Sequence, residues 1–233
     1  MFRITKIKDR LNQEKIIILI DGWSSYESLY LLMRESIPEN YGYLQYAYPN
    51  KILCSDPIKT KANFLYLIKT IENDLNKLNS KCPRSFYLYG QSLGGLFCMI
   101  VADKVKVEKV KLIVPGYNLA EAFWLGQSTQ KLKIDMINKH KMTLSKLKSL
   151  WQTISPDHYF KNRSHQTEFD ITLSSNDVVI PISNGKRLIK FLKDENIKSH
   201  VSWTHLPHQI EMLKEGLFIY NFQKWLVKLH NEK

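Results

Sequence analysis

The sequence predicts an α/β fold in which a mostly parallel central sheet carries helices on both faces. Short runs rich in β-branched and aromatic residues alternate with longer segments whose apolar residues recur at helical spacing. Several short runs are almost wholly apolar, which is typical of parallel strands covered on both faces. The expected strands are Phe2 to Lys8, Lys15 to Ile20, Tyr43 to Tyr48, Ser85 to Tyr89, Lys109 to Val114, Glu168 to Leu173 and Lys198 to Trp203.

Amphipathic helices are expected between these strands. The segment Ala62 to Leu78 has an apolar stripe at helical spacing, made of Phe64, Leu65, Ile68, Ile71, Leu75 and Leu78. Pro181 suits the first turn of a helix that runs to about Glu195, because proline lacks only an amide that has no helical partner there. The last helix is expected over Gln209 to Leu229.

Residues 117–165 break this alternation, because they contain helical patterns but no convincing strand. No linker rich in Pro, Gly or Ser divides the chain. We therefore expect a single domain over residues 1–233, with a small helical cap inserted at about residues 117–165.

The composition favours a globular protein with dispersed positive charge. Hydrophobic residues make up 44% of the 233 residues, enough for a sizeable core, and the formal net charge is +12. The lysines are scattered, and there is no arginine cluster or recognised nucleic-acid motif. We expect solvated lysine faces and no nucleic-acid partner, although the charge excess favours acidic substrates.

The cysteines and the N-terminal segment bear on the compartment. The three cysteines are an odd number in a long chain and do not resemble a disulfide framework, so we expect them to be reduced. The apolar run Ile16 to Ile20 is far shorter than a signal-peptide core or a membrane span. We therefore expect a cytoplasmic protein without stable membrane insertion.

The segment Gly90-Gln91-Ser92-Leu93-Gly94 carries the clearest chemical signal. A serine hydroxyl is a weak nucleophile, so an enzyme must present it clear of the backbone, beside a base and near amide donors. A sharp strand-to-helix turn flanked by glycines does this. Ser92 is therefore the expected nucleophile of a serine hydrolase; the alternative is a glycine-rich turn whose serine only caps the helix.

With this motif the chain resembles the α/β-hydrolase fold family, in which an acid and a histidine follow the serine in that order. The resemblance implies an acid after the strand that follows the cap, and Asp177 occupies this position; a surface turn aspartate is the alternative. It implies a histidine after the last strand, where His205 and His208 both lie. We choose His208, immediately before the final helix, and keep His205 as the alternative.

The resemblance also implies an oxyanion hole of backbone amides. Leu93, which follows the serine, is expected to donate one N–H. The segment Asp21-Gly22-Trp23 resembles the family's His-Gly-X loop, which assigns the second N–H to Trp23. Asp21 departs from the usual histidine, and Asp21-Gly22 is otherwise simply a turn.

Together these residues predict acyl transfer through an acyl-enzyme, with no metal or organic cofactor. We expect hydrolysis of a carboxylic ester of small or medium acyl chain; a thioesterase is the second hypothesis, and a peptidase or a carbon–carbon bond hydrolase remains open. A catalytically silent small-molecule-binding protein of the same fold is the alternative from another class.

The acyl pocket is expected in the cap, where Phe123, Trp124 and Leu125 would shape it, although they also suit a role in attaching the cap to the core. The sequence leaves the oligomeric state open.

Overall fold

The structure is a computed structural model that describes residues 3–24, 27–159, 167–217 and 219–231. Its centre is a seven-stranded sheet with the order β1-β3-β2-β4-β5-β6-β7. β1 runs antiparallel to β3, whereas every other neighbouring pair is parallel. The strands are β1 (Thr5–Asp9), β2 (Lys15–Ile20), β3 (Tyr41–Ala47), β4 (Ser85–Gln91), β5 (Lys109–Ile113), β6 (Glu168–Ser174) and β7 (Ser199–Thr204). The predicted α/β class is confirmed; Phe2, at the start of the first expected strand, lies outside the described residues.

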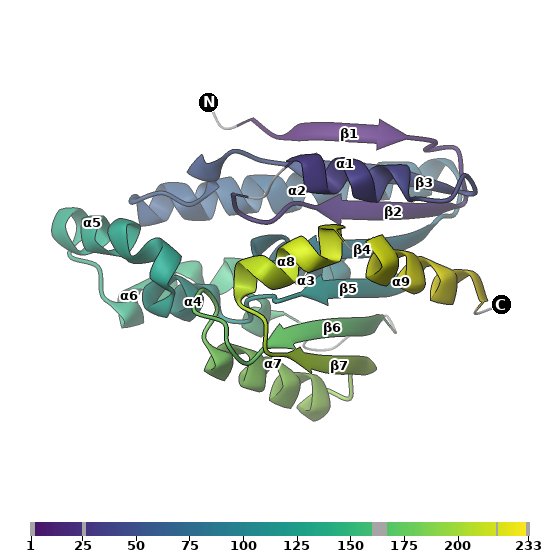
Figure 1. The fold of residues 1–233 in the computed structure, drawn as a ribbon. Coiled ribbons are helices and arrows are strands. Elements are labelled where there is room, and N and C mark those ends of the chain that lie inside the picture. Colours follow the sequence, from purple (N-terminus) through teal and green to yellow (C-terminus); the bar gives the residue numbers. More distant parts are fainter. Residues whose placement is uncertain (1–2, 25–26, 160–166, 218, 232–233) are drawn as a thin grey trace.

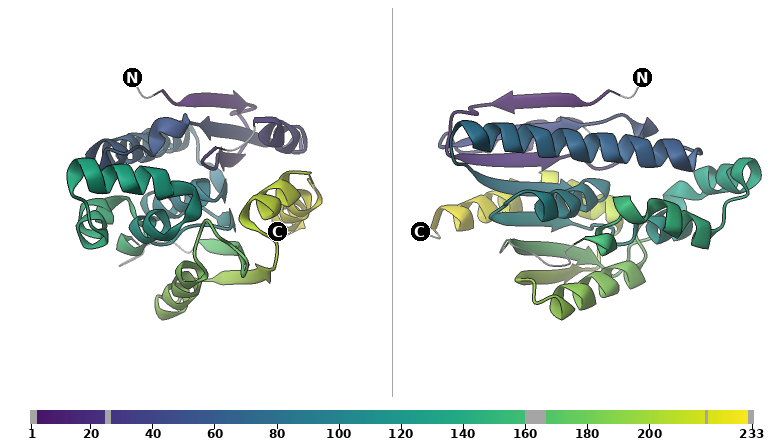
Figure 2. Two further views of the ribbon diagram at one scale, coloured as in Figure 1. Left: turned by 60° about the vertical axis from the view of Figure 1, so that its left-hand side comes forward. Right: turned by 180° about the vertical axis from the view of Figure 1, so that it is seen from behind.

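Helices cover both faces of the sheet (Figure 1; Figure 2). One face carries α2 (Pro57–Lys81), α3 (Leu93–Lys104) and α7 (Ile182–Asp194). The other carries α1 (Glu27–Glu35), α8 (His208–Leu217) and α9 (Ile219–Asn231). The expected last helix thus corresponds to α8 and α9, which lie on either side of the undescribed Phe218.

The longest helix, α2, begins before the predicted Ala62. Asp56 caps it, because its Oδ1 accepts hydrogen bonds from the backbone amides of Ile58 at 2.9 Å and Lys59 at 3.0 Å, and Pro57 occupies the first turn. Its buried apolar stripe comprises Phe64, Leu67, Ile68, Ile71 and Leu75. The prediction that Leu65 belongs to this stripe is wrong: Leu65 is 40% exposed and Leu67 takes its place.

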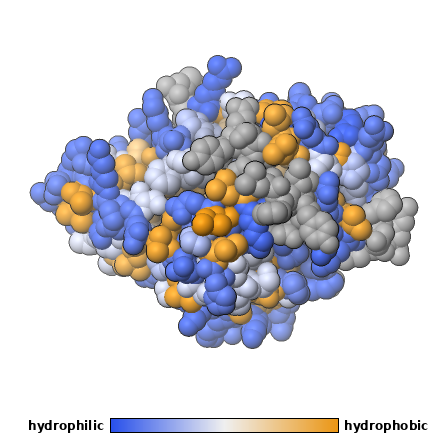
Figure 3. Space-filling view, in the orientation of Figure 1, coloured by the Kyte–Doolittle hydropathy of each residue, from blue (hydrophilic) through white to orange (hydrophobic). Residues whose placement is uncertain are grey.

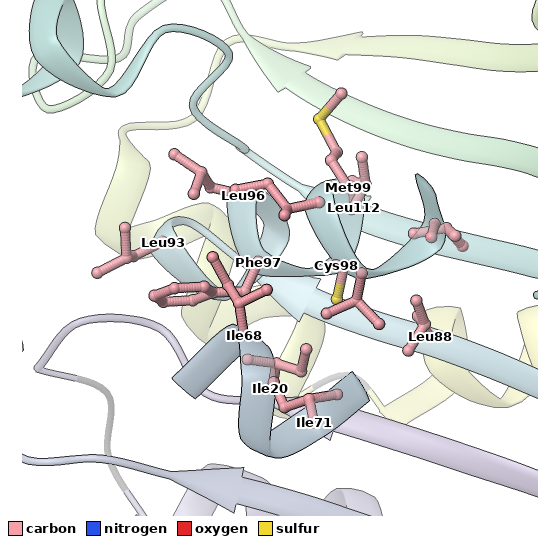
Figure 4. Packing of buried hydrophobic residues seen from close by; sticks show 14 of the residues in the cluster. Ile20, Ile68, Ile71, Leu88, Leu93, Leu96, Phe97, Cys98, Met99 and Leu112 are labelled. Atoms are coloured by element: carbon pink, nitrogen blue, oxygen red, sulfur yellow. The ribbon is translucent and has the colours of Figure 1, made fainter. Parts of the chain in front are cut away.

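The apolar strands divide their side chains between two core clusters, since successive residues of a strand point to opposite faces. In β2, Ile16, Ile18 and Ile20 pack toward α2 and α3, and Ile17 and Leu19 pack toward α1 and α9. Figure 4 shows the first cluster, in which α3 lies between β4 and α2. Burial on both faces explains why β2 and β4 are nearly continuous apolar runs.

Beyond the carboxyl ends of the parallel strands lies a helical segment, residues 119–158, which we call the cap (Figure 1). It comprises α4 (Leu119–Leu125), η2 (Gln127–Thr129), α5 (Gln130–His140), α6 (Leu144–Trp151), η3 (Gln152–Ile154) and η4 (Pro156–His158). Trp151 attaches it to α2, because its Nε1 donates to the Pro57 carbonyl at 2.9 Å. Within the cap, the Trp151 ring meets that of Phe123 edge to face. Residues 160–165 of the expected cap lie outside the described residues.

Candidate active site

Ser92 lies in a sharp turn between β4 and α3. Its backbone has φ 50° and ψ −118°, a conformation that costs energy for a residue with a side chain. The flanking glycines permit the turn: a Cβ at Gly94 would lie 2.1 Å from the Ile20 carbonyl oxygen, and one at Gly90 would lie 2.5 Å from the backbone of Gly94. The strand-turn-helix context predicted for this motif is therefore present, and the hydroxyl stands at the amino end of α3.

The structure brings Ser92, His208 and Asp177 into one hydrogen-bonded chain. His208 Nε2 lies 2.9 Å from Ser92 Oγ, and His208 Nδ1 lies 2.6 Å from Asp177 Oδ2. Ser92 is 7% exposed, and the side chains of His208 and Asp177 are 4% and 3% exposed. With its proton on Nδ1, the imidazole is placed to donate to the carboxylate and to accept a hydrogen bond from the serine hydroxyl, and all three groups are nearly excluded from water.

Asp177 also holds the loop in which it lies. Its second oxygen, Oδ1, accepts hydrogen bonds from the backbone amides of Val179 and Ile180, both at 2.7 Å. The carboxylate therefore has three donors when His208 is included, which fixes its orientation. The acid and the segment that follows it are thus one rigid unit.

His205, the alternative base, lies elsewhere. It is exposed, and its Nδ1 contacts Ser175 Oγ at 2.7 Å rather than Ser92 or Asp177. His208 opens α8, and its buried ring turns toward the end of β4. Of the two histidines, the structure places only His208 in contact with the serine.

The loop after β2 approaches the serine with its backbone. The Gly22 amide donates to the Tyr30 hydroxyl at 3.0 Å, and the Trp23 indole donates to the Asn50 carbonyl at 3.0 Å. Among the described residues, the backbone amides of Trp23 and Leu93 have no hydrogen-bond acceptor. The oxyanion-hole role expected of these two amides stays a prediction.

Asp21, where the resembled family usually has histidine, is buried and firmly held. Its Oδ1 accepts from Gln45 Nε2 at 2.7 Å, and Gln45 Oε1 in turn accepts from the Arg34 guanidinium. Its backbone carbonyl accepts from the Tyr48 hydroxyl. Burial, and secondarily the nearby Asp21 charge, raises the pKa of Tyr48 well above its ordinary value, so this phenol stays protonated as a donor.

A small apolar cavity adjoins Ser92. The volume of the cavity is about 50 Å³. Its walls are Trp23, Leu53, Ser92, Leu93, Leu96, Gly116, Leu119, Ala122, Phe123, Thr129, Val179 and Ile180. Of the three cap residues expected to shape an acyl pocket, Phe123 lines this cavity, whereas Trp124 and Leu125 do not; Leu125 is 52% exposed.

Most of these wall residues were not identified from the sequence. Val179 and Ile180 lie two and three residues after Asp177, so their proximity to the site could have been expected. Gly116 and Leu119 follow β5, whose carboxyl end lies at the same edge of the sheet as those of β4 and β6. Leu53 carries no local signal, because only the tertiary fold brings it to the serine.

The cap lysines are solvated. Lys131, Lys139 and Lys141 are exposed, and Figure 3 shows a mostly hydrophilic surface at the end of the molecule where α5 lies. Lys133 places its ammonium 5.2 Å from the centroid of the Trp124 ring. The dispersed basic charge noted in the sequence is thus, in this part of the chain, a charged outer surface.

In the described part of the chain, no three His, Cys, Asp or Glu side chains are grouped as metal ligands. No helix among the described residues has the length and apolar character needed to cross a membrane.

Comparison with known proteins gives structural relatives only, since neither a protein-family model nor a curated protein matches the sequence. Esterase B from Lactobacillus rhamnosis (HN001) aligns with a TM-score of 0.59 at 13% identity, over 98% of this chain and 88% of that one. The esterase Pf2001 from Pyrococcus furiosus aligns with a TM-score of 0.62 at 11% identity, over 97% and 84%. A chain of the Glycosylation Associate Protein (Gap123) complex from Streptococcus agalactiae aligns with a TM-score of 0.68 at 15% identity, over 98% of this chain but 44% of that one. Similarity at this level of identity concerns the fold, and the chain therefore has the α/β-hydrolase fold of these esterases.

Proposed function

We propose that the protein is a serine hydrolase that cleaves a carboxylic ester through an acyl-enzyme on Ser92. One observation carries this proposal: Ser92 Oγ, His208 and Asp177 form a continuous chain of contacts at 2.9 and 2.6 Å, with all three side chains nearly excluded from water. A hydroxyl that only capped α3 would not need a buried imidazole and carboxylate behind it. Moreover, the Ser92 side chain makes no capping hydrogen bond to α3.

The proposed reaction begins when Ser92 Oγ attacks the ester carbonyl carbon and His208 Nε2 takes the hydroxyl proton. Asp177 keeps the imidazole in the required tautomer and stabilises the imidazolium. The carbonyl oxygen becomes an oxyanion that accepts hydrogen bonds from the Trp23 and Leu93 amides. Loss of the alcohol, which takes the proton from His208, leaves the acyl group on Ser92.

In the second half of the reaction, His208 takes a proton from water as the water oxygen attacks the acyl carbon. The tetrahedral intermediate collapses, the carboxylic acid leaves, and Ser92 Oγ regains its proton from His208. Every proton is therefore carried by one imidazole. The buried Asp21, held by Gln45, supports the loop that presents the Trp23 amide, so its carboxylate serves as an anchor in this scheme.

Hydrolysis of p-nitrophenyl acetate by the wild type and by alanine variants tests the proposal. Ser92→Ala and His208→Ala should each lower kcat by at least about 10³-fold, since removing one member of such a relay disables the whole. His205→Ala is the matched control, because it removes a nearby imidazole that contacts Ser175 instead. Retained activity in His208→Ala, or its loss in His205→Ala, would reject the assigned base.

An acyl-thioester arm of the same assay addresses the thioesterase hypothesis, which shares all of these residues. Acetyl thioester turnover exceeding that of the matched oxygen ester would reassign the leaving group and keep the triad. A folded wild type that hydrolyses neither substrate and does not react at Ser92 with a fluorophosphonate would leave the silent binding protein as the better explanation.

A further inference from the structure

The cavity beside Ser92 limits what acyl group the site can hold. Its volume of about 50 Å³ corresponds to roughly three to five water-sized atoms at about 10–15 Å³ each. The wall is apolar apart from Ser92 itself and Thr129, whose hydroxyl is bonded to the Phe123 and Gly126 carbonyls. A charged, amino-bearing or aromatic acyl group has neither the partners nor the room it needs there.

The cavity cannot widen easily, because two of its walls are fastened together. The cap turn at η2 is linked to the loop that contains Asp177 and Val178, which we call the acid loop. The Gln127 amide donates to the Val178 carbonyl at 3.1 Å. The acid loop is held in turn by Asp177, which accepts from the Val179 and Ile180 amides. Moving these walls apart to admit a longer chain would break hydrogen bonds of the same loop that orients His208.

Gly116 and Ile180 are neighbours in the wall of this cavity. A Cβ placed on Gly116 would lie 3.7 Å from Ile180 Cδ1, 3.8 Å from Ala122 Cβ and 3.9 Å from Leu96 Cδ1, all at ordinary van der Waals distance. All four residues line the cavity, and Figure 4 shows Leu96 near the start of α3, in the turn of helix that follows the serine. Gly116 is also outside the left-handed backbone region, so a methyl group can be added there without strain.

We propose that the preferred substrates are esters of short aliphatic acids with about two to four carbons, and that Gly116 and Ile180 set this limit. The inference rests on the proposed function, since it takes the cavity as the site of the acyl group on Ser92. Longer chains are disfavoured because, as formed by the described residues, the cavity has no unfilled space for each further methylene.

The test is a series of p-nitrophenyl esters from acetate to octanoate. For the wild type, kcat/KM should be highest within the two- to four-carbon range and about 10- to 200-fold lower for octanoate, since a misplaced methylene in an apolar pocket has an effect of this size. Gly116→Ala should lower the butanoate-to-acetate ratio by about tenfold. Ile180→Val, which removes Cδ1, should raise the hexanoate-to-acetate ratio by a similar factor.

The double variant Gly116→Ala/Ile180→Val is the sharpest test, because the added methyl narrows the cavity 3.7 Å from the place where the loss of Ile180 Cδ1 widens it. Its chain-length profile should return toward that of the wild type. The matched control is Ile134→Ala, which removes apolar atoms from the same cap at a side chain that is 56% exposed and outside the cavity wall.

Two failures are distinguishable. A wild type that reacts with a fluorophosphonate at Ser92 but hydrolyses octanoate as fast as acetate would overturn the short-chain limit and leave the serine hydrolase standing. Chain-length ratios unchanged in both single variants would also overturn it. A folded wild type that neither reacts at Ser92 nor hydrolyses any ester would instead remove the proposed function on which the inference depends.

Discussion

Replacing Asp177 by asparagine isolates the electrostatic role of the acid from its structural one. The amide oxygen can still accept from Val179 and Ile180, as Asp177 Oδ1 does at 2.7 Å in both cases. The amide NH₂ then faces His208 Nδ1, where the carboxylate Oδ2 lay at 2.6 Å. This geometry forces the imidazole proton onto Nε2, the nitrogen that must accept the proton of Ser92.

The wrong tautomer should lower kcat by about 10⁴-fold, or about 5.5 kcal/mol at 1.36 kcal/mol per factor of ten. Stability should change little, because the loop hydrogen bonds survive. Asp177→Ala loses these bonds as well, so its free energy of unfolding should be about 1 kcal/mol lower than that of Asp177→Asn, as expected for the loss of a side-chain cap. Steady-state hydrolysis of p-nitrophenyl acetate and thermal unfolding measure the two effects. An asparagine variant with more than a tenth of wild-type kcat would refute this reasoning.

Three further predictions concern residues outside the proposed catalytic relay. Gln45→Leu leaves the buried Asp21 carboxylate without its amide donor and should destabilise the protein by about 1–3 kcal/mol in urea unfolding; an unchanged midpoint would show that Asp21 needs no such anchor. Burial raises the pKa of the Cys98 thiol well above its ordinary value, so iodoacetamide at neutral pH should modify exposed Cys82 in the native protein and reach Cys98 only after unfolding, as peptide mapping would report. Partial burial alone would raise the pKa of Glu168, but its lysine partners outweigh this and lower it, so its stabilisation is present above about pH 4.3 and is lost as the pH falls through the lowered pKa. Glu168→Gln should therefore lose less stability than the wild type between about pH 5 and pH 3. Parallel plots of unfolding free energy against pH for the two proteins would contradict the assignment.

The fold was predictable because local patterns and tertiary burial agree. Strands β2 and β4 are nearly continuous apolar runs, since both of their faces are covered, and their alternation with helical patterns indicates a parallel sheet. The turn at Ser92 was predictable for a related reason: Gly90 and Gly94 stand where backbone segments approach too closely for a side chain.

The walls of the cavity were not predictable to the same degree, because they depend on how helices rotate as they pack. Phe123, Trp124 and Leu125 are consecutive on α4, so their side chains point in directions about 100° apart, and only Phe123 faces the cavity. No periodicity identifies which one it is. The partners of Asp21 were hidden for another reason: Gln45 lies on a different strand, and sequence patterns do not pair isolated polar residues.

The reaction of Ser92 with a fluorophosphonate tests the central claim most directly. Intact-mass spectrometry and peptide mapping should show one adduct on Ser92 in the folded wild type and none in Ser92→Ala. His208→Ala should react far more slowly, because the serine then has no base at 2.9 Å. Modification at a different residue, or equal rates in the wild type and His208→Ala, would contradict an activated Ser92 as the nucleophile.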